Sequence, residues 1–125
     1  MMLYAIRGAI CAENSSESIW GRTRELLEEI LRANTLDIDN IVSIIFTCTK
    51  DLNQAYPAVS AREMGILHAS LMCMAEMDVV GSMEGCIRVQ VMAYMGVPQN
   101  QVKHIYMGRA RALRPDIVGG VQNAE

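Results

Sequence analysis

The chain has 125 residues, of which 51% are hydrophobic and 20% are charged, and its formal net charge is −3. This length predicts one domain that can bury its own core. The acidic balance argues against a surface that binds nucleic acids or anionic membranes. No hydrophobic run approaches the roughly 20 residues of a membrane-spanning helix. Because the N-terminus lacks the pattern of a signal peptide, we expect a cytoplasmic protein.

The cysteines and histidines predict neither a metal site nor a disulfide framework. Cys11, Cys48, Cys73 and Cys86 form no Cys-x-x-Cys pair, and the chain has two histidines. We therefore expect free thiols in a reducing compartment. The motifs of phosphate-binding loops, serine hydrolases and zinc proteases are also missing, so the sequence indicates none of these catalytic sites.

The first half of the chain predicts two strands around a helix. Residues 2–10 have the short hydrophobic side chains of a strand, interrupted by a single arginine. A helix then runs from a cap at Asn14, with Glu17 three residues later, to Ala33, because its hydrophobic residues recur at helical spacing. Residues 41–49 are rich in β-branched side chains, which is typical of a buried strand.

The second half predicts shorter elements. One or two helical turns are expected over 58–64, and strands over 67–75, 86–95 and 104–107. In the strand 86–95 the alternation of side chains places Arg88 on the face opposite Ile87 and Val89. A short helix is expected over 108–113.

These elements predict an α+β fold, a single mixed β-sheet with a long helix packed on one face. One helix cannot cover both faces of five strands, so the other face needs a partner, and homo-oligomerisation is the simplest way to supply one. The domain is expected to span residues 1–118, followed by a flexible tail over 119–125.

Two arginines in predicted strands are the strongest indication of a binding site. Arg7 and Arg88 stand among hydrophobic residues, where a buried guanidinium without a partner is costly. Each needs an acidic partner, an anionic ligand or solvent. Glu76 is the natural acidic partner, but one carboxylate does not balance several arginines. Ion pairs or outward-facing side chains are the structural alternative, and Arg62 has the spacing of a surface charge on a helix.

Several fragments together resemble a known family. They follow one another in the same order and with similar spacing as in the AroH-class chorismate mutases. The fragments are Tyr4-x-Ile6-Arg7-Gly8-Ala9, Asp51-Leu52, Tyr56-Pro57-Ala58 with Arg62, Cys73-Met74-Ala75-Glu76-Met77-Asp78-Val79, Cys86-Ile87-Arg88-Val89, Val97-Pro98-Gln99, His104-Ile105-Tyr106 and Leu113-Arg114-Pro115-Asp116. The resemblance extends from Tyr4 to Asp116.

The resemblance implies a homotrimeric pseudo-α/β-barrel with active sites between subunits. It implies an isomerase that converts chorismate to prephenate, in phenylalanine and tyrosine biosynthesis, by a cofactor-free [3,3]-sigmatropic rearrangement. Carried onto this sequence, Arg7 and Tyr106 would bind the carboxylate of the enolpyruvyl arm. Arg88 would donate to the ether oxygen of the breaking bond, and Glu76 and Cys73 would contact the ring hydroxyl.

The resemblance assigns the remaining site residues to a neighbouring subunit and to the C-terminal segment. Tyr56, Ala58 and Arg62 would come from the neighbour, with Arg62 near the second carboxylate. Leu113 would close over the ligand with Arg114 close by.

Val59 and Met72 depart from the family pattern, which puts polar contacts and the shape of the pocket wall in doubt. Two other functions remain open at this point. One is a non-catalytic trimeric binder of small anionic metabolites. The other is an enzyme that acts on imines or enamines in a similar small trimeric fold.

Overall fold

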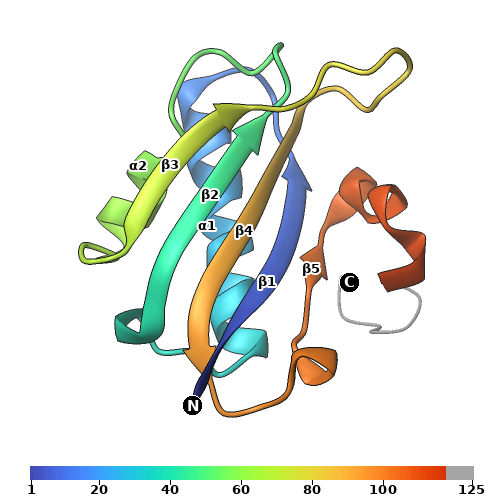
Figure 1. Ribbon diagram of the computed structural model, residues 1–125. Helices are drawn as coiled ribbons and strands as arrows, with labels where there is room; N and C mark the ends of the chain where they lie inside the picture. Colours follow the sequence, from blue (N-terminus) through green and yellow to red (C-terminus); the bar gives the residue numbers. More distant parts are fainter. Residues whose placement is uncertain (118–125) are drawn as a thin grey trace.

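The computed structural model describes residues 1–117, which form one mixed sheet with both α-helices on the same side (Figure 1). Its strands are β1 (Met2–Cys11), β2 (Ile41–Cys48), β3 (Ser70–Ala75), β4 (Cys86–Met95) and β5 (Ile105–Tyr106), and its helices are α1 (Ser16–Ala33), α2 (Ala58–Glu63) and the 3₁₀ helices η1 (Ile38–Asn40), η2 (Gln99–Gln101) and η3 (Gly108–Leu113). The strand order is β3-β2-β4-β1-β5. Strand β4 is antiparallel to β1 and β2, whereas β5 is parallel to β1 and β3 is parallel to β2. The predicted α+β fold with a mixed sheet is confirmed.

The core lies between the sheet and α1, which runs behind the strands in Figure 1. The helix buries one hydrophobic face through residues that include Leu26, Leu27 and Ile30. These side chains share a cluster with Ile6 of β1 and Phe46 of β2, both fully buried. We call the side of the sheet that faces α1 the inner face and the opposite side the outer face.

Alternation along β4 separates the two faces as predicted. Ile87, Val89 and Val91 are buried on the inner face, whereas Arg88 and Gln90 are more exposed and point to the outer face. The prediction for Arg88 is therefore confirmed.

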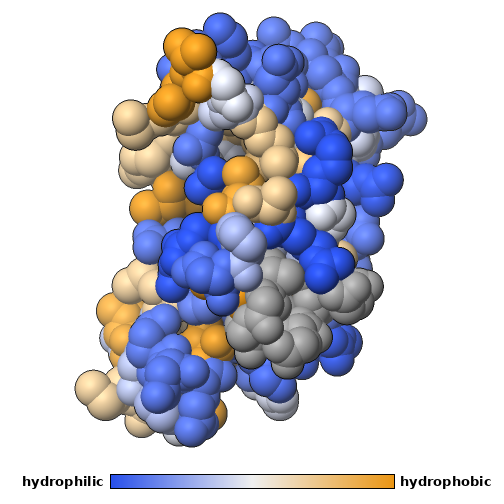
Figure 2. All heavy atoms as spheres, turned by 90° about the vertical axis from the view of Figure 1, so that its right-hand side faces the viewer, coloured by the Kyte–Doolittle hydropathy of each residue, from blue (hydrophilic) through white to orange (hydrophobic). Residues whose placement is uncertain are grey.

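The outer face also carries exposed hydrophobic side chains. Leu3, Met72, Met74 and Tyr94 are between 44% and 51% exposed. Figure 2 shows the molecule from the side of β5 and η3, so the outer face lies along the left-hand edge of the picture. Hydrophobic side chains gather along that edge. An exposed group of this kind is typical of a surface that meets another protein.

The predicted start of the first helix is wrong by one residue. Ser15, and not Asn14, is the N-cap, and its side chain accepts a hydrogen bond from the Ser18 nitrogen. The Asn14 side-chain oxygen instead accepts from the backbone nitrogens of Asn53 and Gln54. The Asn14 side-chain oxygen therefore holds the loop after β2 in place. It cannot also cap the helix, because both roles need the same acceptor.

The third strand is shorter than predicted, since β3 begins at Ser70 and not at residue 67. Its pairing with β2 starts at Ser43 opposite Ser70, and the preceding Leu67 and His68 are exposed. Hydrophobic side chains at 67–69 alone do not extend β3, although β2 itself begins two residues before Ser43, at Ile41. The tail predicted over 119–125 lies outside the described residues.

A histidine fixes the short strand β5 beside β1. The Arg7 backbone nitrogen donates to His104 Nδ1 at 2.9 Å, next to the paired residues Gly8 and Ile105. Burial, together with the positive charges of Arg7 and Arg114, lowers the pKa of His104 to about 4. A neutral imidazole therefore serves as the acceptor that holds the backbone of Arg7 in place.

Gly8 occupies a point where the inner face of β1 meets α1. A methyl group there would lie 2.9 Å from Ile30 Cδ1, 3.1 Å from Val89 Cγ2 and 3.2 Å from the Ile105 carbonyl oxygen.

We expect Gly8→Ala to lower the free energy of unfolding by about 1–3 kcal/mol, because the carbonyl cannot move without shifting β5. Gly21→Ala is the matched control, since nothing lies within 4 Å of that position in α1. The control is expected to raise stability by up to about 1 kcal/mol. Urea unfolding measures both, and a Gly8→Ala variant as stable as the wild type would contradict this account of packing.

Stability is expected to decrease in acid through His104. Its folded pKa of about 4 lies below the ordinary value of 6.5, so the unfolded chain binds more protons between these pH values. The stability is fully present above pH 6.5 and is lost as the pH falls to 4, by up to about 3 kcal/mol. We expect His104→Gln to flatten this decrease, whereas His68→Gln, at the exposed histidine, retains the wild-type slope. Urea unfolding at a series of pH values tests this, and equal slopes for the two variants would refute it.

Candidate active site

One row of residues crosses four strands on the outer face. Thr47 of β2 is paired with Arg88 of β4, Arg88 with Ala9 of β1, and Ala9 with Tyr106 of β5. Paired residues in neighbouring strands lie side by side on one face. The small and fully buried Ala9 therefore lies between Arg88 and Tyr106 in this row.

Glu76 joins this row from the end of β3. Its backbone nitrogen donates to the Cys48 carbonyl oxygen at 2.9 Å, which continues the pairing of β3 with β2. Its carboxylate accepts a hydrogen bond from Thr47 Oγ1 at 2.5 Å and lies 3.7 Å from Arg88 Nε. The side chains of Arg88 and Glu76 are 41% and 25% exposed, so this ion pair remains accessible to a ligand. The predicted partnership of Glu76 with Arg88 is confirmed.

Arg7 lies diagonally across from Arg88. On β1 it pairs with Gln90, two residues from the pair of Ala9 with Arg88. Diagonal neighbours of this kind are roughly 7–8 Å apart at their Cα atoms, within reach of two long side chains. The two strand arginines therefore face one region of the outer surface, as a shared anionic ligand requires.

Tyr106 is surrounded by positive charge. Burial raises the pKa of its hydroxyl, and the charges of Arg7, Arg114 and Arg88 act in the opposite direction. Arg114 follows η3 and forms an ion pair with Asp116 at 2.8 Å. Three arginines thus converge on a neutral phenol, and a neutral phenol can donate a hydrogen bond to an anion.

Leu113 closes a small hydrophobic cluster beneath this site. Ala9, Cys86 and Tyr106 are buried there with Ala110, and Leu113 packs against them at the end of η3. The C-terminal segment predicted to cover a ligand therefore lies next to Tyr106 in this chain.

The other predicted site residues lie at the opposite edge of the sheet. Tyr56, Ala58 and Arg62 belong to α2 and the loop before it, beside β3, whereas Tyr106 is on β5 (Figure 1). Four spacings of roughly 4.8 Å separate β3 from β5. Tyr56 is 72% exposed and Arg62 is also exposed, whereas Ala58 is buried. The fold does not bring these residues to the arginine group within one chain.

Cys73 lies on a different face from Glu76. It pairs with the buried Phe46 and packs against the inner core. Together with Tyr56 and Trp20 it lines a cavity of about 620 Å³ between β3 and the loop before α2. Its thiol is thus near the predicted neighbour-derived residues and not near Arg88.

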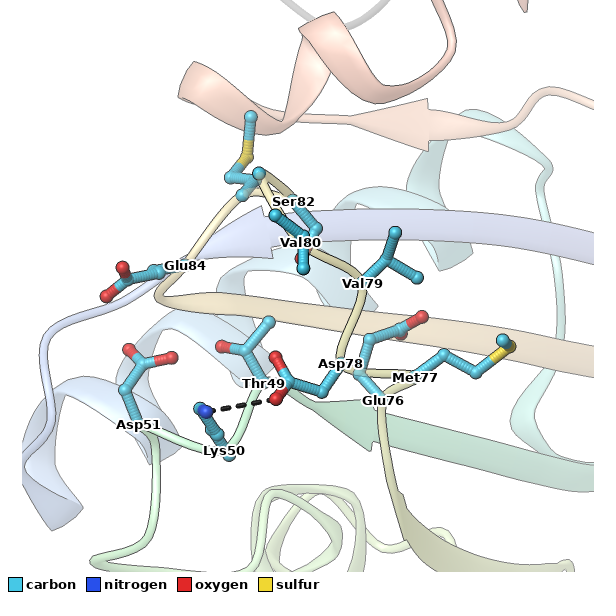
Figure 3. A pocket seen from close by; sticks show the side chains of 12 residues that line it. Thr49, Lys50, Asp51, Glu76, Met77, Asp78, Val79, Val80, Ser82 and Glu84 are labelled. Carbon is cyan, nitrogen blue, oxygen red and sulfur yellow. Dashed lines mark hydrogen bonds and ion pairs between the residues drawn. The ribbon is translucent and has the colours of Figure 1, made fainter.

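Glu76 also borders a second cavity of about 330 Å³, which is formed by residues 49–51 and 76–84 (Figure 3). Asp51, Asp78 and Glu84 line it as well, and Lys50, which is paired with Asp78 at 2.9 Å, is its one basic residue. This cavity is acidic, so an anion would be repelled from it. The arginine side of Glu76 is therefore the better location for an anionic ligand.

The described residues, 1–117, contain neither a cluster of metal ligands nor a membrane-spanning helix. No group of three or more His, Cys, Asp or Glu side chains in this part of the chain is arranged to hold a metal ion. None of the helices described there has both the length and the hydrophobicity to cross a membrane.

Sequence reasoning missed two residues that hold the site together. Thr47 binds Glu76, and its outer position follows from its alternation with Ile44 and Phe46 on the inner face. His104 holds the backbone of Arg7 across 97 residues of sequence, which no local pattern indicates.

The comparisons with known proteins point to one family. The family described as chorismate mutase type I matches residues 3–117. The chain is 38% identical to the chorismate mutase AroH of Bacillus subtilis (strain 168) over 119 residues, which are 94% of each chain. It is 40% identical to the chorismate mutase AroH of Thermus thermophilus over 118 residues, 93% of this chain and 97% of that protein.

A solved structure is also similar. The chorismate mutase from Clostridium thermocellum superposes with a TM-score of 0.85 at 45% identity, covering 86% of this chain and 97% of that one. The matches span nearly the full lengths compared, with no large part of the relatives left out. The chain belongs to the chorismate mutase type I family.

Proposed function

We propose that this protein isomerises chorismate to prephenate at sites formed between the subunits of a homotrimer in the cytoplasm. As a member of the chorismate mutase type I family it is an isomerase. The observation that carries the proposed mechanism is the row of Arg88, Ala9 and Tyr106, with Arg7 beside it and Glu76 at its end. Free thiols at all four cysteines suit a reducing compartment.

The charges of the site suit a dianionic substrate. Arg7, Arg88 and Arg114 converge on Tyr106, and the nearby carboxylates are those of Glu76 and Asp116. The group therefore contains one more arginine than it contains carboxylates. Arg7 and Tyr106 bind the carboxylate of the enolpyruvyl arm, since a guanidinium and a phenol both donate hydrogen bonds.

Arg88 acts on the bond that breaks. Negative charge grows on the ether oxygen as the carbon–oxygen bond stretches, and a fixed guanidinium stabilises that charge more than it stabilises the ground state. The ion pair with Glu76 and the pairing with Ala9 hold Arg88 in position before the substrate arrives. Glu76, itself oriented by Thr47, accepts from the ring hydroxyl and favours the positive charge that develops on the ring.

The reaction requires no cofactor and no proton transfer. It is a rearrangement within one molecule, so the protein helps by holding the enolpyruvyl arm over the ring and by stabilising charge. A neutral Tyr106 and a neutral His104 suit this role, because neither has to change its charge during turnover.

The second half of each site comes from a neighbouring subunit. Tyr56, Ala58 and Arg62 lie at the opposite edge of the sheet from Tyr106, so only another copy of the chain can bring them together. Arg62 then meets the second carboxylate, and Cys73, which shares a cavity with Tyr56, reaches the ligand from the same side. The exposed hydrophobic side chains of the outer face provide a surface for this contact.

Replacing Arg88 tests the chemistry. We expect Arg88→Ala to lower kcat for the loss of chorismate absorbance by at least about 100-fold, because the guanidinium acts mainly in the transition state. Its thermal unfolding should change little, since the ion pair is partly exposed. Arg24→Ala is the matched control, because Arg24 forms an exposed ion pair with Glu28 on α1. If Arg88→Ala had the same kcat as the wild type, the proposed role of Arg88 would be ruled out. If the wild type bound chorismate without converting it, a metabolite-binding protein would be favoured.

Mixing inactive variants tests whether sites are shared. Arg88→Ala and Arg62→Ala are each expected to lose most activity. Trimers reassembled from an equal mixture should regain about a quarter of the wild-type sites, because one subunit supplies Arg88 and its neighbour supplies Arg62. A mixture of Arg88→Ala with Arg7→Ala is the control, since both residues lie on the same side of a site and no intact site can form. Equal recovery in the two mixtures, or none in either, would contradict a site shared in this way.

A further inference from the structure

Two cysteines face each other across the ends of β1 and β4. Cys11 is the last residue of β1 and is paired with Cys86, the first residue of β4. Both are free thiols on the outer face, where Cys11 lies two residues after Ala9 and Cys86 two residues before Arg88. The function proposed above uses neither thiol.

The hydrogen bonds around this pair identify its geometry. The Ala12 nitrogen donates to the Gly85 carbonyl oxygen at 2.9 Å, just beyond the two cysteines. In an antiparallel ladder this makes the neighbouring Cys11–Cys86 pair a non-hydrogen-bonded one, with Cα atoms roughly 4.5 Å apart. Disulfides span Cα distances of about 4.4–6.8 Å. The backbone therefore already holds the two cysteines at bonding distance.

The other two cysteines serve as an internal comparison. Cys48 and Cys73 also lie on adjacent strands, but Cys73 pairs with Phe46 and Cys48 pairs with Ala75. Such a diagonal offset separates Cα atoms by roughly 7–8 Å, beyond the range of a disulfide. Of the four cysteines, only Cys11 and Cys86 are aligned for a bond.

We propose that Cys11 and Cys86 form a redox-sensitive cross-strand disulfide, closed by a low-molecular-weight disulfide such as oxidised glutathione. The thiolate of one cysteine attacks the glutathione disulfide, which forms a mixed disulfide and releases one glutathione thiolate. The second cysteine then attacks the protein sulfur and releases the second glutathione. Two protein thiols are oxidised, one small disulfide is reduced, and the two thiol protons end on the two released glutathione molecules.

The surroundings give the order of these steps. Cys11 is half-buried and its Sγ contacts Met83 Sδ at 3.8 Å, whereas Cys86 is 3% exposed. Burial and the neighbouring Cys11 raise the pKa of Cys86 to about 11, although the charge of Arg88 acts in the opposite direction. The oxidant therefore reacts first with Cys11, and Cys86 completes the bond from within the hydrophobic cluster.

The disulfide would link the two strands that carry the arginines. It joins β1, which bears Arg7, to β4, which bears Arg88, and it closes a long loop in the unfolded chain. A cross-link of this length restricts the unfolded state strongly, so oxidation is expected to raise the Tm by roughly 5–15 °C. Reduction returns the chain to the thiol form.

The experiment counts thiols after incubation of the full chain with oxidised glutathione. Excess oxidant is removed, and the protein is unfolded in guanidinium chloride at neutral pH in the presence of a maleimide, which labels the remaining thiols for mass spectrometry. The wild type is expected to lose two of its four thiols without bound glutathione, and peptide mapping should join Cys11 to Cys86. Cys11→Ser and Cys86→Ser should each form no intramolecular disulfide and show no comparable rise in Tm. Cys48→Ser and Cys73→Ser, as matched controls, should still lose two thiols.

Three outcomes would overturn the proposal. One is a wild type that keeps all four thiols. Another is a bond that maps to Cys48 and Cys73, or one that joins two chains on a non-reducing gel. The third is a wild type that gains glutathione without closing a disulfide. Thiol counts do not depend on chorismate turnover, so failure of the proposed function would leave this test unaffected.

Discussion

The register of β1 against β4 is the constraint on which the site depends. The two strands pair over ten residues without interruption, from Met2 opposite Met95 to Cys11 opposite Cys86. Side chains alternate between faces, so this register places Arg7 and Arg88 on the outer face and hydrophobic residues such as Ile6 on the inner one. A slip of one residue in either strand would bury a guanidinium in the core, at a cost that the fold could not offset. The inner hydrophobic core and the outer arginine group therefore stabilise the same register.

The outer face can hold this positive charge because solvent reaches it. Arg88 and Glu76 are partly exposed and 3.7 Å apart, so their contact orients the two side chains without fully desolvating either. The buried polar groups of the site are instead neutral. Tyr106 and His104 are buried, and their shifted pKa values keep both uncharged near neutral pH. The site thus combines rigid neutral donors and acceptors with accessible cations, an arrangement that suits a substrate bringing its own negative charge.

Much of this could be predicted from the sequence because it depends on local periodicity. Alternation along β4 correctly placed Arg88 opposite Ile87, and the spacing of hydrophobic residues correctly predicted α1. The predicted cap at Asn14 is wrong, since Asn14 and Ser15 are both good caps and the choice depends on the loop at Asn53. Contacts between distant segments, such as His104 with the Arg7 nitrogen, have no local signal. The convergence of Arg7, Arg88 and Glu76 was expected through the family resemblance, because spacing alone indicated only that the arginines needed partners.

The same topology explains why the proposed site needs residues from more than one chain. The order β3-β2-β4-β1-β5 sends α2 and Arg62 to one edge of the sheet and Tyr106 with the C-terminal segment to the other. Bending the sheet until its edges met would break the α1 packing that fixes the register of β1. Under the proposed assembly, a second copy against the outer face would avoid this conflict, because it would cover exposed residues such as Met72 and bring an Arg62 to the arginine group without changing the chain's own core. In the proposed trimer, burial of that hydrophobic surface and completion of the site are thus one event, so the free energy of assembly also organises the catalytic groups.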